Sequence, residues 1–153
     1  MDWQSDMAAI LLAIFCGVVI GLEREFMHKP AGLRTNVLIC LGAALFTIIS
    51  KRMAGDQDSI TRIAAQIVTG VGFLGAGAVI QDRGGIHGLT TAATIWLVAS
   101  VGMSCGAKLY WLAIISTVLA IVVLLGLAQV DKHIRPGSGI EQKKDTSHKD
   151  NGL

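Results

Sequence analysis

Charged side chains are scarce in this chain: 16% of its 153 residues are Asp, Glu, Lys or Arg, whereas 52% are hydrophobic. Soluble globular domains usually carry about 25% charged residues, so the composition argues against such a domain. The formal net charge of +2 is too small to predict nucleic-acid binding. The chain is also short for two domains, and one domain embedded in a lipid bilayer is the simplest interpretation.

Cysteine is sparse as well. The three cysteines, Cys16, Cys40 and Cys105, are widely spaced, and each lies within an apolar run. Their spacing fits neither a disulfide framework nor a set of metal ligands. We interpret them as small apolar packing residues and predict no cofactor, while the sequence leaves open whether a metal ion binds.

Long apolar runs are the main feature that the sequence does have. Residues 63–80 read IAAQIVTGVGFLGAGAVI, an uncharged stretch long enough to cross the hydrocarbon core of a bilayer. Together with four other apolar runs, it predicts an all-α, polytopic membrane helix bundle of about five spans. The predicted spans are residues 7–22, 36–50, 63–80, 89–107 and 109–130.

Basic residues orient these spans. If the N-terminus lies outside and the C-terminus inside, the cytoplasmic segments hold nine of the thirteen Lys and Arg residues, as the positive-inside rule favours. The last segment is polar and cannot bury enough apolar surface to fold alone. We therefore predict a transmembrane domain over residues 1–130 and a disordered cytoplasmic tail over residues 131–153.

Two short patterns match enzyme motifs without predicting an enzyme. Gly70, Gly72 and Gly75 satisfy the dinucleotide fingerprint, which requires a preceding strand and a helix start outside the membrane. Ser104 lies in a G-x-S-x-G pattern, but every histidine is predicted at the opposite membrane face, too far to act as its base. We therefore expect a protein without catalytic residues.

Glycine spacing predicts close helix packing instead. G-x-x-x-G pairs occur in the first and fourth predicted spans, and glycines cluster in the third. Small residues of this kind let two membrane helices approach closely. The predicted packing positions are Gly17, Gly21, Gly72, Gly75, Gly77, Gly102 and Gly106.

Gln66 is the polar residue of most interest within a span. It shares one helix face with Gly70, Phe73 and Gly77. An amide that faced lipid would be unsatisfied, so we expect Gln66 to face a partner helix or a cavity. It either forms an interhelical hydrogen bond that stabilises packing or forms one wall of a polar path.

Charged and polar residues gather where the predicted inward loops meet the membrane. Ionisable groups at that depth need partners, and Arg34 is placed to pair with Glu23 or Glu25 across the first loop. The cluster either caps helix ends, through Thr35 or Asn36 and Thr90, or forms a polar docking site. Its predicted members are Glu23, Arg24, Glu25, Arg34, Thr35, Asn36, Asp82 and Thr91.

Five segments of the chain resemble the MgtC/SapB family of bacterial membrane proteins. They are GLERE at 21–25, KPAGLRTN at 29–36, LICLGAALF at 38–46, RIAAQIVTGVGFLGAGAVI at 62–80 and GLTTAATIWLVASVGM at 88–103. The resemblance implies a multi-pass protein of the bacterial inner membrane. It also implies a role in growth under low magnesium and, in pathogens, survival inside macrophages.

The chain departs from this family in two places. Long members carry a soluble C-terminal domain, for which residues 131–153 are too few, and Lys108 stands where the family usually has glycine. We expect a non-enzymatic regulatory protein that acts through the bilayer and other membrane proteins, with self-association left open. The alternative is a transporter or channel for magnesium or another ion, which would need a continuous polar path that the sequence does not show.

Overall fold

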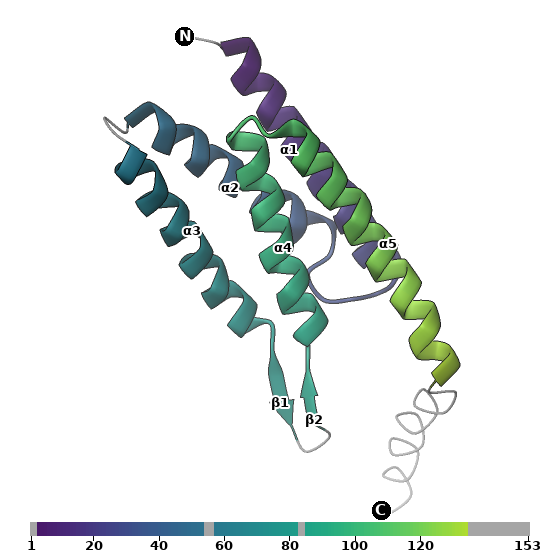
Figure 1. Cartoon of the computed structure of the whole chain (residues 1–153). Helices are drawn as coiled ribbons and strands as arrows, with labels where there is room; N and C mark the ends of the chain where they lie inside the picture. Colours follow the sequence, from purple (N-terminus) through teal and green to yellow (C-terminus); the bar gives the residue numbers. More distant parts are fainter. Residues whose placement is uncertain (1–2, 54–56, 83–84, 135–153) are drawn as a thin grey trace, which may run out of the picture. The chain divides into compact units, whose positions relative to one another are not determined.

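The computed structural model describes residues 3–53, 57–82 and 85–134. Five helices and one short hairpin follow one another along the chain (Figure 1). The elements are α1 (Trp3–Phe26), α2 (Leu33–Met53), α3 (Gln57–Gly77), β1 (Ile80–Asp82), β2 (Gly85–His87), α4 (Leu89–Gly106) and α5 (Tyr110–Ile134).

The predicted all-α bundle of five helices is confirmed. The chain divides into two compact units, Met1–Ile121 and Val122–Leu153, and all packing discussed below lies within the first. The predicted tail lies outside the described residues from position 135 onward.

Glycines bring α1 against α2. A Cβ atom added to Gly17 would lie 2.9 Å from Cα of Val37, and one added to Gly21 would lie 2.8 Å from Cα of Leu33. Real Cβ atoms do not approach other backbone atoms this closely, so only glycine permits the observed spacing between the two helices. The G-x-x-x-G pattern of the first predicted span thus forms a helix contact.

A second glycine pair brings α4 against α2. A Cβ atom on Gly102 would collide with the carbonyl oxygen of Cys40, and one on Gly106 would collide with that of Ala44. The α2 helix therefore touches glycine backbone on both α1 and α4. Its side chains on the α4 side are small, as at Cys40, Ala43 and Ala44.

The third group of predicted packing glycines behaves differently. A Cβ atom on Gly75 would make ordinary contacts with Ala92 of α4, the nearest at 3.6 Å. No described atom lies within 4 Å of such a Cβ on Gly72 or Gly77, so the predicted packing of these two against neighbouring helices of the chain is wrong. Instead α3 contacts the other helices through Ile67 and Val71, on a different face.

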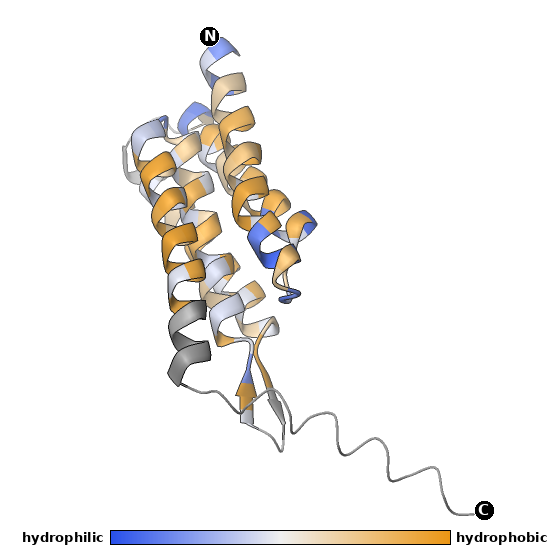
Figure 2. Cartoon of the chain, turned by 90° about the vertical axis from the view of Figure 1, so that its right-hand side faces the viewer, coloured by the Kyte–Doolittle hydropathy of each residue, from blue (hydrophilic) through white to orange (hydrophobic). Residues whose placement is uncertain are grey.

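The outer surface of the bundle is apolar. Large side chains such as Leu11, Phe15, Leu38 and Val118 are more than half exposed, and Figure 2 shows hydrophobic residues along the helices. Within the described residues, four helices have the length and hydropathy of membrane spans: Trp3–Phe26, Leu33–Met53, Leu89–Gly106 and Tyr110–Leu127. The chain is therefore a membrane protein. That α3 also spans the membrane stays a prediction.

A β-hairpin follows α3 where the sequence predicts continued helix. The helix ends at Gly77 rather than at Ile80, and β1 pairs antiparallel with β2, with Ile80 opposite His87. Gly88 closes the hairpin at a φ of 87°, and a Cβ there would collide with the carbonyl oxygen of Ala78. The sequence signal for this hairpin is the adjacent pair Gly84-Gly85, a dipeptide typical of tight turns between strands.

Candidate functional site

Arg24 is the central residue of the predicted polar cluster. It lies in the last turn of α1, on the face that Gly17 and Gly21 share, and is only 2% exposed. Its Nη2 donates a hydrogen bond of 2.6 Å to Oγ1 of Thr91, in the first turn of α4. This contact joins the end of α1 to the start of α4, and we call this region the Arg24 end of the bundle.

The buried guanidinium of Arg24 is only partly satisfied. Within the described chain no carboxylate lies within 4 Å of it, and its buried Nε has no hydrogen-bond partner. Oε2 of the adjacent Glu23 is also buried without a partner, although its charge acts on Arg24 through space. Burying charged groups with unmet hydrogen bonds is costly, so Thr91 is an important contact for this guanidinium.

Glu25 caps the second helix. Its Oε2 accepts a hydrogen bond of 3.0 Å from the backbone N–H of Leu33, the first residue of α2. A negative charge at a helix N-terminus also interacts favourably with the helix dipole. A Cβ atom on Gly32 would lie against this carboxylate, so a larger residue there would shift the Glu25 side chain.

Asn36 is fully buried between α1 and α2. Its Nδ2 donates hydrogen bonds to the carbonyl oxygens of Ala31, at 2.5 Å, and Gly32, at 2.9 Å, and thereby holds the turn that precedes α2. Its Oδ1 is buried without a partner among the described residues. Asn36 therefore does not act as the predicted helix cap, because its amide donates to carbonyls instead of accepting from an N–H group.

Within the described chain, Thr35 and Thr90 do not cap helices with their side chains as predicted. Thr35 is exposed, and the residue that caps α4 is Gly88, with no side-chain hydrogen bond to the helix start. Thr90 takes part through its carbonyl oxygen, which accepts from Oγ1 of Thr94. Glu25 is the residue that provides a side-chain cap at the Arg24 end.

The predicted pair between Arg34 and a carboxylate of the first loop is not formed. Arg34 is exposed on the first turn of α2, and no ion pair joins it to Glu23 or Glu25 in the part of the chain that the structure describes. The carboxylate of Glu25 instead accepts a hydrogen bond from the backbone N–H of Leu33. Asp82 forms part of β1 opposite Gly85, and its side chain lies outside the description.

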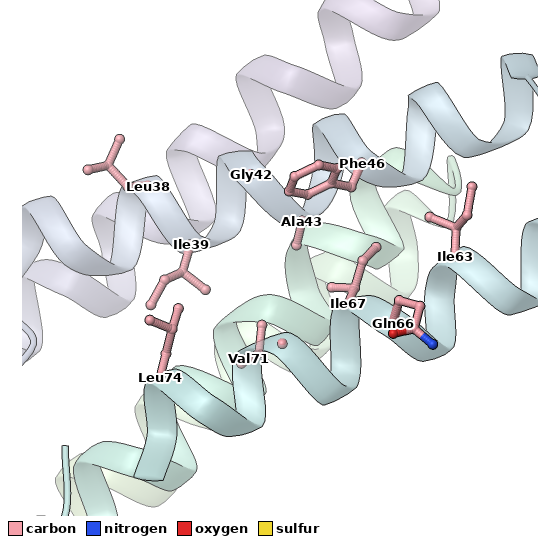
Figure 3. A pocket seen from close by; sticks show the side chains of 11 residues that line it. Leu38, Ile39, Gly42, Ala43, Phe46, Ile63, Gln66, Ile67, Val71 and Leu74 are labelled. Carbon is pink, nitrogen blue, oxygen red and sulfur yellow. The ribbon is translucent and has the colours of Figure 1, made fainter. Parts of the chain in front are cut away.

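Gln66 lines an apolar groove between α2 and α3, with a volume of about 580 Å³. Figure 3 shows Ile39 of α2 and Leu74 of α3 pointing toward one another across this groove. Gln66 is exposed, and no hydrogen bond to another described residue satisfies its amide. The expected interhelical hydrogen bond is therefore not formed within the described chain, and the other groove residues are apolar.

The family follows from comparison with known proteins. The model of the MgtC family matches residues 10–133. This chain belongs to the MgtC family. No solved structure matches it.

Two relatives illustrate the extent of the similarity. Protein MgtC of Brucella abortus is 49% identical over 126 residues, which cover 80% of this chain and 52% of the relative. Protein MgtC of Salmonella typhimurium is 41% identical over 125 residues, 82% of this chain and 53% of the relative. The chain thus spans about half the length of these curated relatives.

In this MgtC-family chain, a second polar network lies at the opposite end of the bundle, and sequence reasoning missed it. Asp6 of α1 forms ion pairs with Arg52 of α2, and with Lys108 at an N–O distance of 3.5 Å. Lys108 Nζ also donates to Oγ of Ser5, at 2.6 Å, and the hydroxyl of Tyr110 donates to the carbonyl of Ser5. We call these five residues the Asp6 network.

Lys108 has a backbone φ of 66°, in the left-handed region. The turn between α4 and α5 thus holds a lysine in a conformation that favours glycine, and the ammonium contacts offset the resulting strain. Its ammonium partners Ser5 and Asp6 lie about a hundred residues away in the sequence, so local patterns do not predict them.

Within the described side chains, no group of three or more His, Cys, Asp or Glu is arranged to hold a metal ion. Cys16, Cys40 and Cys105 are buried and free of disulfides. They belong to the close contact of α1, α2 and α4, where Cys40 meets Gly17.

Proposed function

We propose that this protein is a non-enzymatic regulator in the bacterial inner membrane, linked to magnesium limitation, and that it acts by contacting other membrane proteins. Membership of the MgtC family supports the membrane location and the magnesium link. The name of a further relative, YhiD of Escherichia coli strain K12, provisionally describes a magnesium transporter. That relative is 50% identical over 122 residues, or 75% of this chain and 56% of its own length.

The packing between the two polar ends carries this proposal. Most of the buried side chains of α1, α2 and α4 there are apolar, as at Ala13, Cys16, Ala44 and Val98. A carrier or channel needs polar groups or water along its pathway. A tightly packed apolar core suits a scaffold that presents a surface better than it suits a pathway for a divalent cation.

The few buried hydroxyls of this core do not form a path either. Thr47 donates to the carbonyl oxygen of Ala43, and Thr94 donates to that of Thr90. Each hydroxyl is thus bonded to its own helix, one turn earlier.

The Arg24 end then has two roles in the proposed regulator. Its buried residues, Arg24, Asn36 and Thr91, hold the first loop and the start of α4 in one arrangement. Arg34 and Thr35, exposed on α2, are available to a partner. The predicted N-out orientation places Arg34 on the cytoplasmic side. Its positive charge there suits an acidic partner surface.

The first test is charge reversal at Arg34. Arg34→Glu should abolish growth support in low magnesium while leaving the amount of protein in the membrane nearly normal, because this side chain is exposed and supports no described contact. Lys29→Glu is the matched control, since Lys29 is exposed in the preceding loop. Normal growth of the Arg34→Glu strain would remove Arg34 from the docking surface.

The second test addresses transport, the alternative function. The regulator predicts no protein-dependent magnesium flux when the purified chain is reconstituted into liposomes with a magnesium gradient. The transporter predicts clear flux that Glu23→Gln stops. Flux of that kind would overturn the regulator, whatever the growth assay shows.

A further inference from the structure

A second groove, with a volume of about 360 Å³, lies between α3 and α4 and reaches α2. Val68, Val71 and Ala99 form part of its apolar wall, and Trp96 lines it from the middle of α4. At its far end Lys51, in the last turn of α2, lies beside Ala107. The groove is thus apolar along its length and carries an ammonium group at its mouth.

The length of this groove matches one leaflet of a bilayer. Its lining on α4 extends from Trp96 to Ala107. Eleven residues of helix rise by about 16 Å, which is roughly half the ~30 Å hydrocarbon core. An acyl chain anchored at the mouth would therefore reach about the middle of the membrane.

The hydroxyl groups in the groove wall do not disfavour an acyl chain. The hydroxyls that line it, on Thr47, Ser100 and Ser104, all donate to carbonyl oxygens of their own helices. Their polar hydrogens are therefore satisfied and not directed at a ligand. The groove behaves as an apolar surface despite these residues.

The mouth has a positive charge without an anionic partner. Lys51 Nζ donates one hydrogen bond, of 2.9 Å, to the carbonyl oxygen of Ala107. No carboxylate of the described side chains lies within 4 Å of it. An ammonium has three donors, so Lys51 can bind a further acceptor.

We propose that the groove binds one acyl chain of an anionic phospholipid, with the lipid phosphate at Lys51. The apolar wall matches the chain, the length matches one leaflet, and the ammonium matches the phosphate. Basic residues beside membrane helices attract anionic lipids in this way. The site is independent of the regulatory function proposed above.

Tryptophan quenching tests the proposal. Trp96 is 53% exposed and lines the groove, so with Trp3 and Trp111 replaced by phenylalanine it reports on bound brominated lipid. In detergent micelles we expect dibrominated phosphatidylglycerol to quench Trp96 at about fivefold lower concentration than dibrominated phosphatidylethanolamine, the factor that corresponds to about 1 kcal/mol per lysine.

Lys51 variants distinguish the proposal from general lipid contact. Lys51→Gln should reduce the preference to about one, whereas Lys51→Arg and the distant control Lys29→Gln should retain it; the thermal unfolding of each variant shows that it is folded. Equal quenching by both lipids, or an unchanged preference in folded Lys51→Gln, would overturn the proposal. Reversal of quenching by excess inorganic phosphate would assign the mouth to a free anion and overturn the lipid assignment.

Discussion

The two ends of the first unit hold their polar residues in opposite ways. In the Asp6 network, a partly exposed carboxylate pairs with Arg52 and Lys108. At the Arg24 end, a buried cation is held by Thr91, without a carboxylate of the described chain within 4 Å. Ion pairs thus close one end of the bundle, while the other end keeps a charge in the protein interior.

Unmet hydrogen bonds separate the two ends further. Four buried side-chain atoms of the described residues have no partner, and three of them, Arg24 Nε, Glu23 Oε2 and Asn36 Oδ1, belong to the Arg24 end. The fourth is Oγ of Ser50, near the end of α2. The difference indicates that ion pairs fasten helices in the Asp6 network, whereas the Arg24 end leaves buried polar atoms without hydrogen bonds inside the described chain.

The largest effect should come from Gly21, the glycine that brings α1 against α2 near the Arg24 end. Gly21→Leu should lower the stability of the protein by about 3 kcal/mol or more, since the new side chain would meet the backbone of Leu33. Gly72→Leu is the matched control and should leave stability nearly unchanged, because no described atom lies within 4 Å of its Cβ position. Thermal unfolding in detergent measures both, and equal melting temperatures would show that the helix contact at Gly21 adapts.

A smaller effect should come from the hydrogen bond between Arg24 and Thr91. Thr91→Val removes the acceptor while keeping the side-chain shape, and should destabilise the protein by about 1.5–3 kcal/mol because it leaves a buried cation without its bond. Thr94→Val removes a hydroxyl that bonds only its own helix, so its effect should be much smaller. If both variants unfold alike in denaturant, Arg24 has another partner and the contrast between the two ends is weaker.

The smallest effect should appear in the turn at the Asp6 end. Lys108→Gly and Lys108→Ala both remove the ammonium, but only glycine adopts a φ of 66° without strain. The glycine variant should therefore be more stable than the alanine variant by about 1 kcal/mol. Calorimetry or thermal unfolding gives the difference, and a more stable alanine variant would show that the turn changes conformation once the Asp6 contacts are lost.

Local sequence signals predicted some of these features but not others. The G-x-x-x-G spacing identified Gly17, Gly21, Gly102 and Gly106 as contact positions, yet the same reasoning failed for Gly72 and Gly77. Glycine marks positions where two helices are able to approach closely. Whether they do depends on which face of the helix its neighbours contact. In this chain α3 meets α2 and α4 through Ile67 and Val71, so its glycines at 72 and 77 face away from them.

The polar cluster shows the same limit at the level of individual bonds. Charge and position correctly brought Arg24 and Thr91 to one end of the bundle, but Arg34 was expected to bind a carboxylate that instead caps α2. Two donors, the Arg34 guanidinium and the backbone N–H of Leu33, are available to the carboxylate of Glu25, and the folded loop brings the N–H of Leu33 to it. Sequence reasoning has no measure of that distance.

Hydropathy and helical periodicity were sufficient to determine that this chain forms a membrane helix bundle, because the cost of exposing polar backbone to lipid leaves few alternatives. The motifs spread along the chain were likewise sufficient to determine its family. Only the packed helices decided that Arg24 is buried against Thr91 and that Lys108 meets Ser5 and Asp6. Those outcomes depend on contacts between residues far apart in the sequence, where the close approach of three backbones selects one partner among several that the chain makes available.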